Sequence, residues 1–299
     1  MEHTRNTRGV SGGRQRGCRL LVGASLIACG TLLVWSDGVE SKEKRRERGK
    51  QPEATPIATN AGEATRLGAS VADSHPLQPA LKMARQSREQ LASVRDYSAR
   101  FVKREMVRGR QVQQTMDMKL REEPFSVYLQ YVSPHAGREV IYVEGANQGK
   151  LLAHERGIRS LAGTVALAPT SNEAMAESRY PITAIGMAKM LDTIIAQWER
   201  ELHVPDVKVR YFPNAKIGTV ETKMIETSHA QQRENVTFHM TRVYFDKQSN
   251  LPIRVEQFGW PTTAGGQPPL IEEYNYTNVR VNVGLTDIDF DTRNPAYSF

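Results

Sequence analysis

The sequence predicts an α+β domain over residues 80–299, in which an extensive antiparallel sheet packs against helices. Short runs of alternating apolar and polar residues follow one another between turn residues, which is typical of an antiparallel meander. Two other segments repeat their apolar residues at helical spacing. Both cysteines, Cys18 and Cys29, precede the domain. This excludes a disulfide framework, a thiol nucleophile and a Cys-ligated metal within it.

The domain is expected to begin with an amphipathic helix over residues 80–95. Its apolar residues recur at helical spacing: Leu81, Ala84, Leu91 and Val94. The period then changes to two, with Tyr97 and Phe101 on one face of a strand that ends at the turn signal Arg108-Gly109. Four more strands are expected at residues 110–121, at 125–131, around Val140 and Tyr142, and at 151–154.

Residues 156–183 interrupt the strands and are rich in Ala, Gly and Thr, so a loop is expected there. A helix is predicted over 184–202 from its apolar stripe, formed by Met187, Leu191, Ile194, Ile195, Trp198 and Leu202. Strands resume at about 207–212, 218–229, 236–247, 251–258 and 270–282. The prediction is about ten strands and two main helices in one domain.

Residues 1–35 have the pattern of an export segment, because five arginines in the first 19 residues precede an uncharged apolar run of 16 residues, Leu20 to Trp35. The run is slightly short of the ~20 residues of a membrane-spanning helix. An uncleaved anchor or an ordinary signal is preferred over a lipoprotein signal, in which Cys29 would be lipidated, because residues 31–35 stay apolar after the cysteine. Residues 36–79 contain few large apolar residues and are predicted to be a disordered tether. The domain is therefore expected to be exported, and either anchored to the bacterial inner membrane or free in the periplasm.

The charge distribution argues against a nucleic-acid partner. Residues 1–79 carry 12 basic and 8 acidic residues, and residues 80–299 carry 28 and 25. The domain is thus close to neutral, whereas a nucleic-acid-binding domain usually presents a clustered basic face.

Catalytic and metal-binding patterns are scarce in the domain. The sequence contains no GxSxG, GxGxxG, P-loop or HExxH pattern. His154-Glu155 is nearest to a catalytic pair, but a solvent-facing strand end is the simpler interpretation. His229 and His239 approach each other if their strands form a hairpin, yet they lack carboxylates at the spacing of a metal site. We therefore predict no enzyme, no cofactor and no metal.

The domain contains two acidic clusters. Asp287, Asp289 and Asp291 alternate along the chain and could bind calcium together with backbone carbonyls. A polar strand end is the preferred interpretation of that cluster. Glu272-Glu273, in the last long strand, is expected at an exposed edge.

Several short strings resemble the lipoprotein-carrier superfamily of LolA-, LolB- and RseB-like proteins. The most specific is the turn from Asp246 to Arg254, and the others include Tyr97–Phe101, Glu273–Tyr276 and Asp289–Asp291. Within the superfamily, Gly137–Tyr142 and Tyr180–Thr183 resemble a secreted bacterial family of unknown function most closely. The resemblance covers about residues 80–299.

The resemblance implies an unclosed β-barrel, which is a strongly curved antiparallel sheet with helices covering its concave face. The apolar space between the layers can hold acyl chains in such proteins. The residues expected to line this space are Phe101, Leu129, Tyr142, Met187, Leu191, Ile194, Ile195, Trp198 and Leu202. Trp198 should matter most for stability, and its indole N–H should find a polar partner at the rim.

Two functions are favoured by the sequence, and a third, a hydrolase, rests only on His154-Glu155 and the Asp287–Asp291 cluster. The first is a membrane-anchored extracytoplasmic domain that binds a lipid, an acylated protein or another apolar ligand. The second is an envelope protein-interaction or scaffold module whose cavity is filled by its own side chains. The free volume under the 184–202 helix distinguishes the two functions.

Overall fold

The computed structural model describes residues 75–157, 161 and 163–299. The expected anchor at residues 20–35, Cys29 and all but the last five residues of the expected tether lie outside this range. Among the described residues, none of the helices has the length and apolar character needed to span a bilayer.

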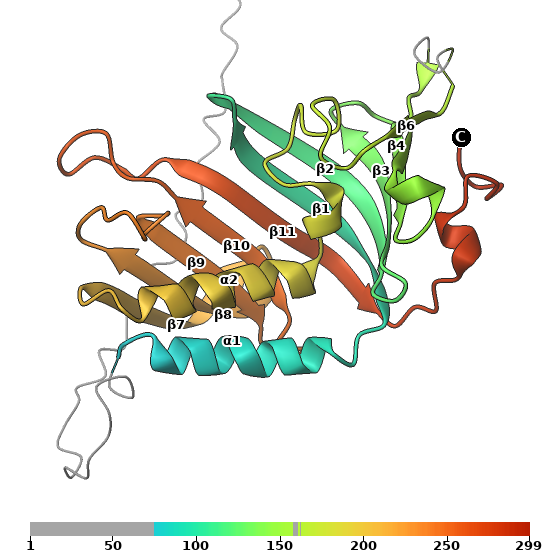
Figure 1. The fold of residues 1–299 in the computed structure, drawn as a ribbon. Coiled ribbons are helices and arrows are strands. Elements are labelled where there is room, and N and C mark those ends of the chain that lie inside the picture. Colours follow the sequence, from blue (N-terminus) through green and yellow to red (C-terminus); the bar gives the residue numbers. More distant parts are fainter. Residues whose placement is uncertain (1–74, 158–160, 162) are drawn as a thin grey trace, which may run out of the picture. The chain divides into compact units, whose positions relative to one another are not determined.

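The sheet contains eleven antiparallel strands in the order β6-β5-β4-β3-β2-β1-β11-β10-β9-β8-β7 (Figure 1). Their bounds are β1 Asp96–Val107, β2 Arg110–Arg121, β3 Ser126–Ser133, β4 Glu139–Val143, β5 Leu151–His154, β6 Val165–Leu167, β7 Val207–Ile217, β8 Val220–His229, β9 Met240–Asp246, β10 Pro252–Phe258 and β11 Leu270–Val281. Two meanders, β1–β6 and β7–β11, therefore meet where β1 pairs with β11. The sheet is not closed, because β6 and β7 are its two edges.

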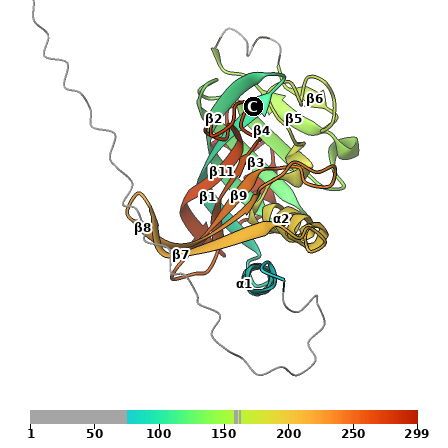
Figure 2. The same ribbon diagram turned by 90° about the vertical axis from the view of Figure 1, so that its left-hand side faces the viewer.

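Two helices, α1 (Gln78–Leu91) and α2 (Met187–Glu201), cover one face of the curved sheet (Figure 2). They are linked by ion pairs between Arg85 and Glu199 and between Arg88 and Asp192, each at 2.7 Å. The predicted α+β fold, with a curved unclosed sheet and helices against it, is confirmed.

The boundaries differ from the predictions in several places, among them the ends of β7, which runs to Ile217 rather than 212, and of α2, which begins at Met187 rather than 184. The first helix ends at Leu91 rather than 95, since Val94 belongs to the turn that follows. The strand expected at 236–247 is shorter, because it begins at Met240. The segment 156–183 was expected to be only loop, but it contains β6, which has three residues and pairs with β5.

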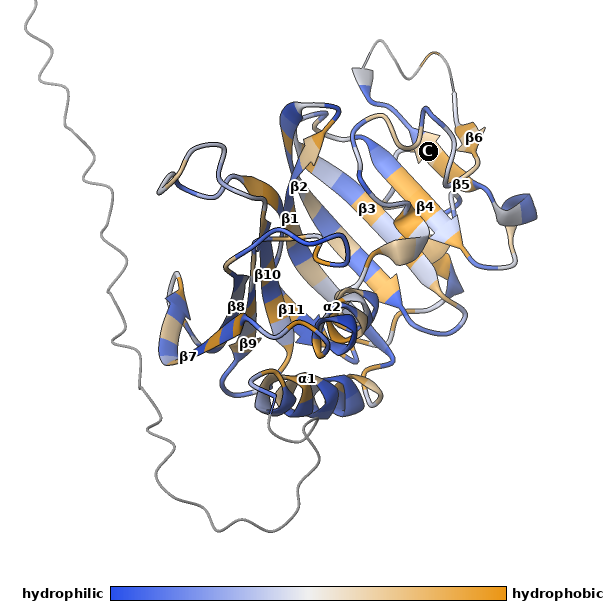
Figure 3. Cartoon of the chain, turned by 60° about the vertical axis from the view of Figure 1, so that its left-hand side comes forward, coloured by the Kyte–Doolittle hydropathy of each residue, from blue (hydrophilic) through white to orange (hydrophobic). Residues whose placement is uncertain are grey.

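The alternation of residues along the strands separates the two faces of the sheet (Figure 3). The face toward the helices carries a single large core, whose bulkiest fully buried members include Trp198, Tyr97, Tyr276, Phe101 and Phe245. The opposite face carries a chain of alternating charges across six strands. Its members are Arg210, Glu226, Arg242, Glu256, Arg254, Glu273 and Arg104.

The start of α2 is fixed by the core rather than by a side-chain cap of its own. The Met187 backbone N–H donates to the hydroxyl oxygen of the buried Tyr97 at 3.0 Å. Gly186 precedes the helix with φ of 117°, and a Cβ there would lie 2.9 Å from Leu120 Cδ1. A glycine is therefore required for this entry to the helix.

Trp198 is fully buried on α2, and replacing it with alanine tests whether it is packed core. We expect Trp198→Ala to lower the free energy of unfolding by ~3–5 kcal/mol, the usual cost of a large cavity in a core. Urea unfolding followed by circular dichroism measures this. The exposed Arg200→Ala on the same helix should change stability by less than ~0.5 kcal/mol. An equally small effect at Trp198 would contradict the packing.

Candidate functional site

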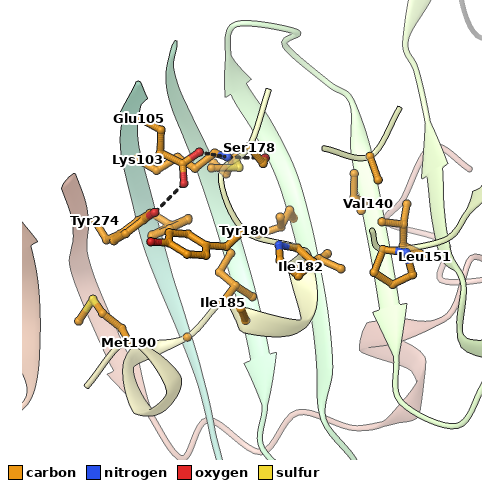
Figure 4. Close-up of a pocket in the computed structure, with 18 of the residues that line it drawn as sticks. Lys103, Glu105, Val140, Leu151, Ser178, Tyr180, Ile182, Ile185, Met190 and Tyr274 are labelled. Atoms are coloured by element: carbon orange, nitrogen blue, oxygen red, sulfur yellow. Dashed lines mark hydrogen bonds and ion pairs between the residues drawn. The ribbon is translucent and has the colours of Figure 1, made fainter. Parts of the chain in front are cut away.

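A cavity of about 290 Å³ lies between the concave face of the sheet and the segment that leads into α2. We call residues 168–186, which connect β6 to α2, the strap. The strap crosses the concave face and forms one wall of the cavity, and its η4 turn (Ile182–Ala184) carries Ile182 into the lining (Figure 4). The other walls come from β1–β6, β10, β11 and the first two turns of α2.

The inner part of the cavity is apolar. Its aliphatic and methionine side chains are Met116, Leu129, Val140, Leu151, Leu167, Ile182, Ile185, Met190, Ile194 and Val255, and its aromatic side chains include Phe101, Tyr274 and Tyr276. Phe101 stacks against Tyr276 with ring centroids 4.8 Å apart. Because apolar groups surround most of this space, an apolar chain can replace water in it favourably.

The cavity and the expected lining overlap only in part. Phe101, Leu129 and Ile194 line the cavity. Tyr142 instead packs beside Phe125, and the remaining stripe residues pack in the core away from the lining: Met187, Leu191, Ile195, Trp198 and Leu202. The expected partner of the Trp198 indole N–H is also absent, since that N–H is buried without an acceptor among the described residues.

Met190 and the strap residues Ile182 and Ile185 were missed by the sequence prediction. Met190 lies one helical turn from both Met187 and Ile194, so the stripe could have included it. The strap residues gave no usable signal, because an irregular segment has no periodicity that indicates which side chains face inward.

A cluster of polar side chains fastens the strap to the sheet at the mouth of the cavity. We call these residues the clasp: Lys103, Glu105, Ser178, Arg179, Glu272 and Tyr274. Lys103 Nζ donates to Ser178 Oγ at 2.6 Å and to Glu105 Oε2 at 3.0 Å. The Tyr274 hydroxyl donates to Glu105 Oε1 at 2.6 Å (Figure 4).

Arg179 completes the clasp by joining two carboxylates that the sheet places side by side. The β1–β11 register sets Glu105 directly opposite Glu272, and like charges at such positions repel each other. The Arg179 backbone N–H donates to Glu105 Oε2 at 3.1 Å, and its Nε donates to Glu272 Oε2 at 2.6 Å. The strap thus provides the positive charge and the donor that these two glutamates need.

A second set of contacts holds the strap to the other half of the sheet. The Glu177 carboxylate accepts a bond from Gln114 Nε2 at 2.9 Å and lies 3.1 Å from His135 Nε2. Arg138 Nη1 lies 3.6 Å from the same carboxylate, and Arg138 Nε donates to Glu155 at 2.6 Å. Residues 177–179 of the strap are therefore held to β1 and β11 by the clasp and to Gln114, His135 and Arg138 by Glu177.

Burial determines the electrostatics of the clasp. It lowers the pKa of Lys103, although Glu105 acts in the opposite direction. It raises the pKa of Glu272, which Arg179 partly offsets. Burial also raises the pKa of Tyr180 at the mouth to about 12, with Glu272 as a second cause. Charged groups in this position need their partners, because an unpaired buried charge is costly.

Lys103 and Ser178 have the separation of a Ser-Lys catalytic pair, but their bonding does not favour that chemistry. The Lys103 ammonium also donates to Glu105 and to the Glu177 carbonyl oxygen, so it already holds the strap to the sheet. The backbone N–H groups of Ser178 and Arg179 are bonded to Met175 O and to Glu105. Neither N–H is therefore available to stabilise an oxyanion.

The histidines considered from the sequence do not assemble a site. Glu155 pairs with Arg138, and the His154 ring lies 5.9 Å from that of Phe299, so these neighbours do not act as a pair. The backbones of His229 and His239 do pair, through an N–H to carbonyl bond of 3.0 Å. Their side chains have different neighbours, since His229 Nε2 lies 3.2 Å from Glu201 and His239 packs on Trp260. The described residues contain no group of three metal-ligating side chains.

Both acidic clusters differ from the expected strand end and exposed edge. Asp287–Phe290 forms the short helix η5 rather than a strand end, and each aspartate has a basic partner of its own: Arg121 for Asp287, Lys119 for Asp289 and Arg293 for Asp291. Glu272 and Glu273 are buried, at 3% and 4% exposure, because β11 is a central strand. Glu272 joins the clasp, and Glu273 joins the charged chain on the opposite face.

Comparison with protein families gives one match, over residues 94–299, to a family described as "Protein of unknown function (DUF1571)". This agrees with the sequence resemblance to a family of unknown function. No curated protein is detectably similar to the chain.

Solved structures with a similar fold include three bacterial proteins. The lipoprotein LppX of Mycobacterium tuberculosis is 12% identical, with 72% of this chain and 100% of that chain covered and a TM-score of 0.41. A putative outer membrane lipoprotein-sorting protein domain from Vibrio parahaemolyticus is 12% identical, with 74% and 97% covered and a TM-score of 0.34. A LolA superfamily protein from Nitrosomonas europaea is 9% identical, with 70% and 97% covered and a TM-score of 0.28. At such low scores these matches specify no function.

The raised pKa of Glu272 predicts a pH dependence of stability. A raised folded-state pKa means that the folded protein binds this proton more readily than the unfolded chain does. The contribution of Glu272 to the free energy of unfolding should therefore increase as the pH falls from about 7 toward the ordinary carboxyl value.

Glu272→Gln is fixed in the neutral form and provides the reference. The unfolding free energy of the wild type minus that of the variant should rise on acidification and level off below about pH 4.5, near the ordinary value for glutamate. Urea titrations at several pH values measure this difference. A difference that falls on acidification would show that the pKa of Glu272 is lowered instead.

Proposed function

Because the chain belongs to the DUF1571 family, whose function is unknown, we propose a function from its own cavity: non-enzymatic binding of an apolar ligand such as a lipid acyl chain. The observation that carries this proposal is the apolar space of about 290 Å³ between the strap and the concave face of the sheet. α2 contributes only its first turns to this wall, while its bulkiest residue, Trp198, packs in the core instead. The free space supports ligand binding over the alternative of a scaffold module with a filled cavity.

The size of the cavity favours a single chain. Small-molecule sites usually measure ~300–1,000 Å³, so this cavity is at the lower limit. Each methylene group transferred from water to such a site contributes ~0.8 kcal/mol. One medium-length chain is therefore sufficient for useful affinity, whereas a lipid with several acyl chains would leave some of them outside.

Binding rather than catalysis is also supported by the bonding of the polar groups. The reactive candidates at the mouth, Lys103 and Ser178, are engaged in holding the strap. An acylated protein is a ligand of the same type, because it would offer the cavity one chain while its polypeptide stayed outside.

We place this function outside the cytoplasm, with the domain anchored to the inner membrane through residues 20–35 or released into the periplasm. The support is the basic head and the apolar run that precede the domain. Anchoring would keep the domain near the membrane, where ligands with acyl chains are found. It would also limit transport over long distances, so a stationary binding role fits better than a shuttle.

The proposal predicts that a side chain added inside the cavity abolishes binding. Ala153 on β5 lines the cavity, whereas Ala166 on the neighbouring strand β6 is exposed and lies outside the lining. Ala153→Phe should weaken the binding of dodecanol by at least about ten-fold, because the ring occupies the space of several methylenes. Displacement of the neutral dye Nile red from the full chain measures this affinity.

Ala166→Phe is the matched control and should bind dodecanol as the wild type does. Circular dichroism and melting temperature establish that both variants are folded. Equal dodecanol affinity in the two folded variants, or no binding by the wild type, would contradict the proposal.

A further inference from the structure

We propose that the mouth of this cavity selects single-chain amphiphiles whose polar end is cationic, such as an amine-bearing lipid, over those with an anionic end. The inference rests on the proposed binding function and defines its ligand class. Three features of the mouth carry it: an excess of carboxylates in the lining, the engagement of Lys103, Arg138 and Arg179 by existing partners, and aromatic rings that already hold cations.

The ionisable side chains that line the cavity are predominantly acidic. Two are cationic, Lys103 and Arg138, and four are acidic, Glu105, Glu155, Glu173 and Glu272. With all of them ionised, the lining has a formal charge of −2. The low-dielectric wall strengthens this field for a charge at the mouth.

The two cations of the lining, Lys103 and Arg138, and the adjacent Arg179 are already engaged by other partners. Lys103 Nζ donates to Glu105, to Ser178 and to the Glu177 carbonyl oxygen, which uses its three protons. Arg138 is shared between Glu155 and Glu177, and Arg179 is bonded to Glu272 and to Met106 O. An anionic headgroup would have to break one of these contacts and would leave a carboxylate unpaired.

Glu173, in contrast to these engaged cations, is free to bind a ligand. Its carboxylate has no hydrogen bond or ion pair with any residue that the structure describes. It lies on the strap, is exposed, and contributes to the lining of the cavity. A cationic headgroup can pair with Glu173 while its chain occupies the apolar interior, and no existing contact has to be broken.

Aromatic rings at the mouth are also suited to a cation. The guanidinium of Arg138 lies 5.3 Å from the centre of the Tyr131 ring, and that of Arg179 lies 5.8 Å from the centre of the Tyr180 ring. Both rings line the cavity. Such rings attract ammonium groups through their π faces, which adds to the attraction of the carboxylates.

The experiment compares three probes with the same alkyl chain: dodecyltrimethylammonium, dodecanol and dodecanoate. Each competes with Nile red on the full chain, below its micellar concentration, at low and at high salt. We expect the cation to bind more tightly than dodecanol and at least about ten-fold more tightly than dodecanoate. Salt should reduce this preference, because the contacts are at a solvent-exposed mouth.

Two variants assign the preference to the mouth. Glu173→Gln should reduce the ratio of cation to dodecanol affinity by about two- to five-fold, the range expected for an exposed charge pair. Glu234→Gln changes an exposed carboxylate outside the lining and should leave the ratio unchanged.

The outcomes separate this inference from the proposed function. Dodecanol binding with equal or tighter binding of dodecanoate would overturn the headgroup selectivity and leave the cavity function intact. A cation preference that neither salt nor Glu173→Gln alters would also overturn it. Failure of dodecanol to displace the dye would overturn the proposed function itself.

Discussion

The pairing of β1 with β11 is the constraint on which the rest of the structure depends. It joins the two meanders through residues that lie about 170 positions apart along the chain, as in the Lys103–Tyr274 and Glu105–Glu272 pairs. The same register sets two glutamates opposite each other on the concave face, where like charges repel. Lys103 on β1 pairs with Glu105, and Arg179 from the strap bonds to both glutamates. The position of the cavity wall thus follows from the register of the sheet.

Successive side chains of β1 and β11 point to opposite faces of the sheet, so each face carries its own set of charged contacts. On the outer face Arg104 pairs with Glu273, which is also 3.1 Å from Arg254. On the inner face, the neighbouring residues Glu105 and Glu272 bond to the strap. Further along the same inner face, Phe101 and Tyr276 are apolar and stack on each other. The concave face therefore has an apolar end, packed against the core, and a polar end, which forms the mouth.

Much of the fold could be predicted from the sequence, because period-two alternation and the stripes around Leu81 and Leu191 are local signals. The site was less predictable. Phe101, Leu129 and Ile194 could be placed in the lining because the alternation or helical spacing shows which face of the strand or helix carries them. The clasp, however, depends on contacts between residues that are distant in sequence, such as Lys103 and Ser178. Glu272 looked like an exposed edge residue because the position of its strand in the sheet depends on topology, which composition does not encode. The strap has no repeat, so its inward residues could not be identified.

The charged clasp is better explained by positioning than by stability. Apolar residues of similar volume would often stabilise a buried site at least as well as an ion pair does. Apolar residues, however, make non-directional contacts, so they would allow the strap to pack on the sheet in many alternative positions. The bonds from Arg179 to Glu105 and Glu272 specify one position, and the contacts of Glu177 specify a second. With residues 177–179 of the strap held in place, Ile182 and Ile185 line the apolar interior. The free volume is then preserved, because the strap is held at a distance from the sheet instead of collapsing onto it.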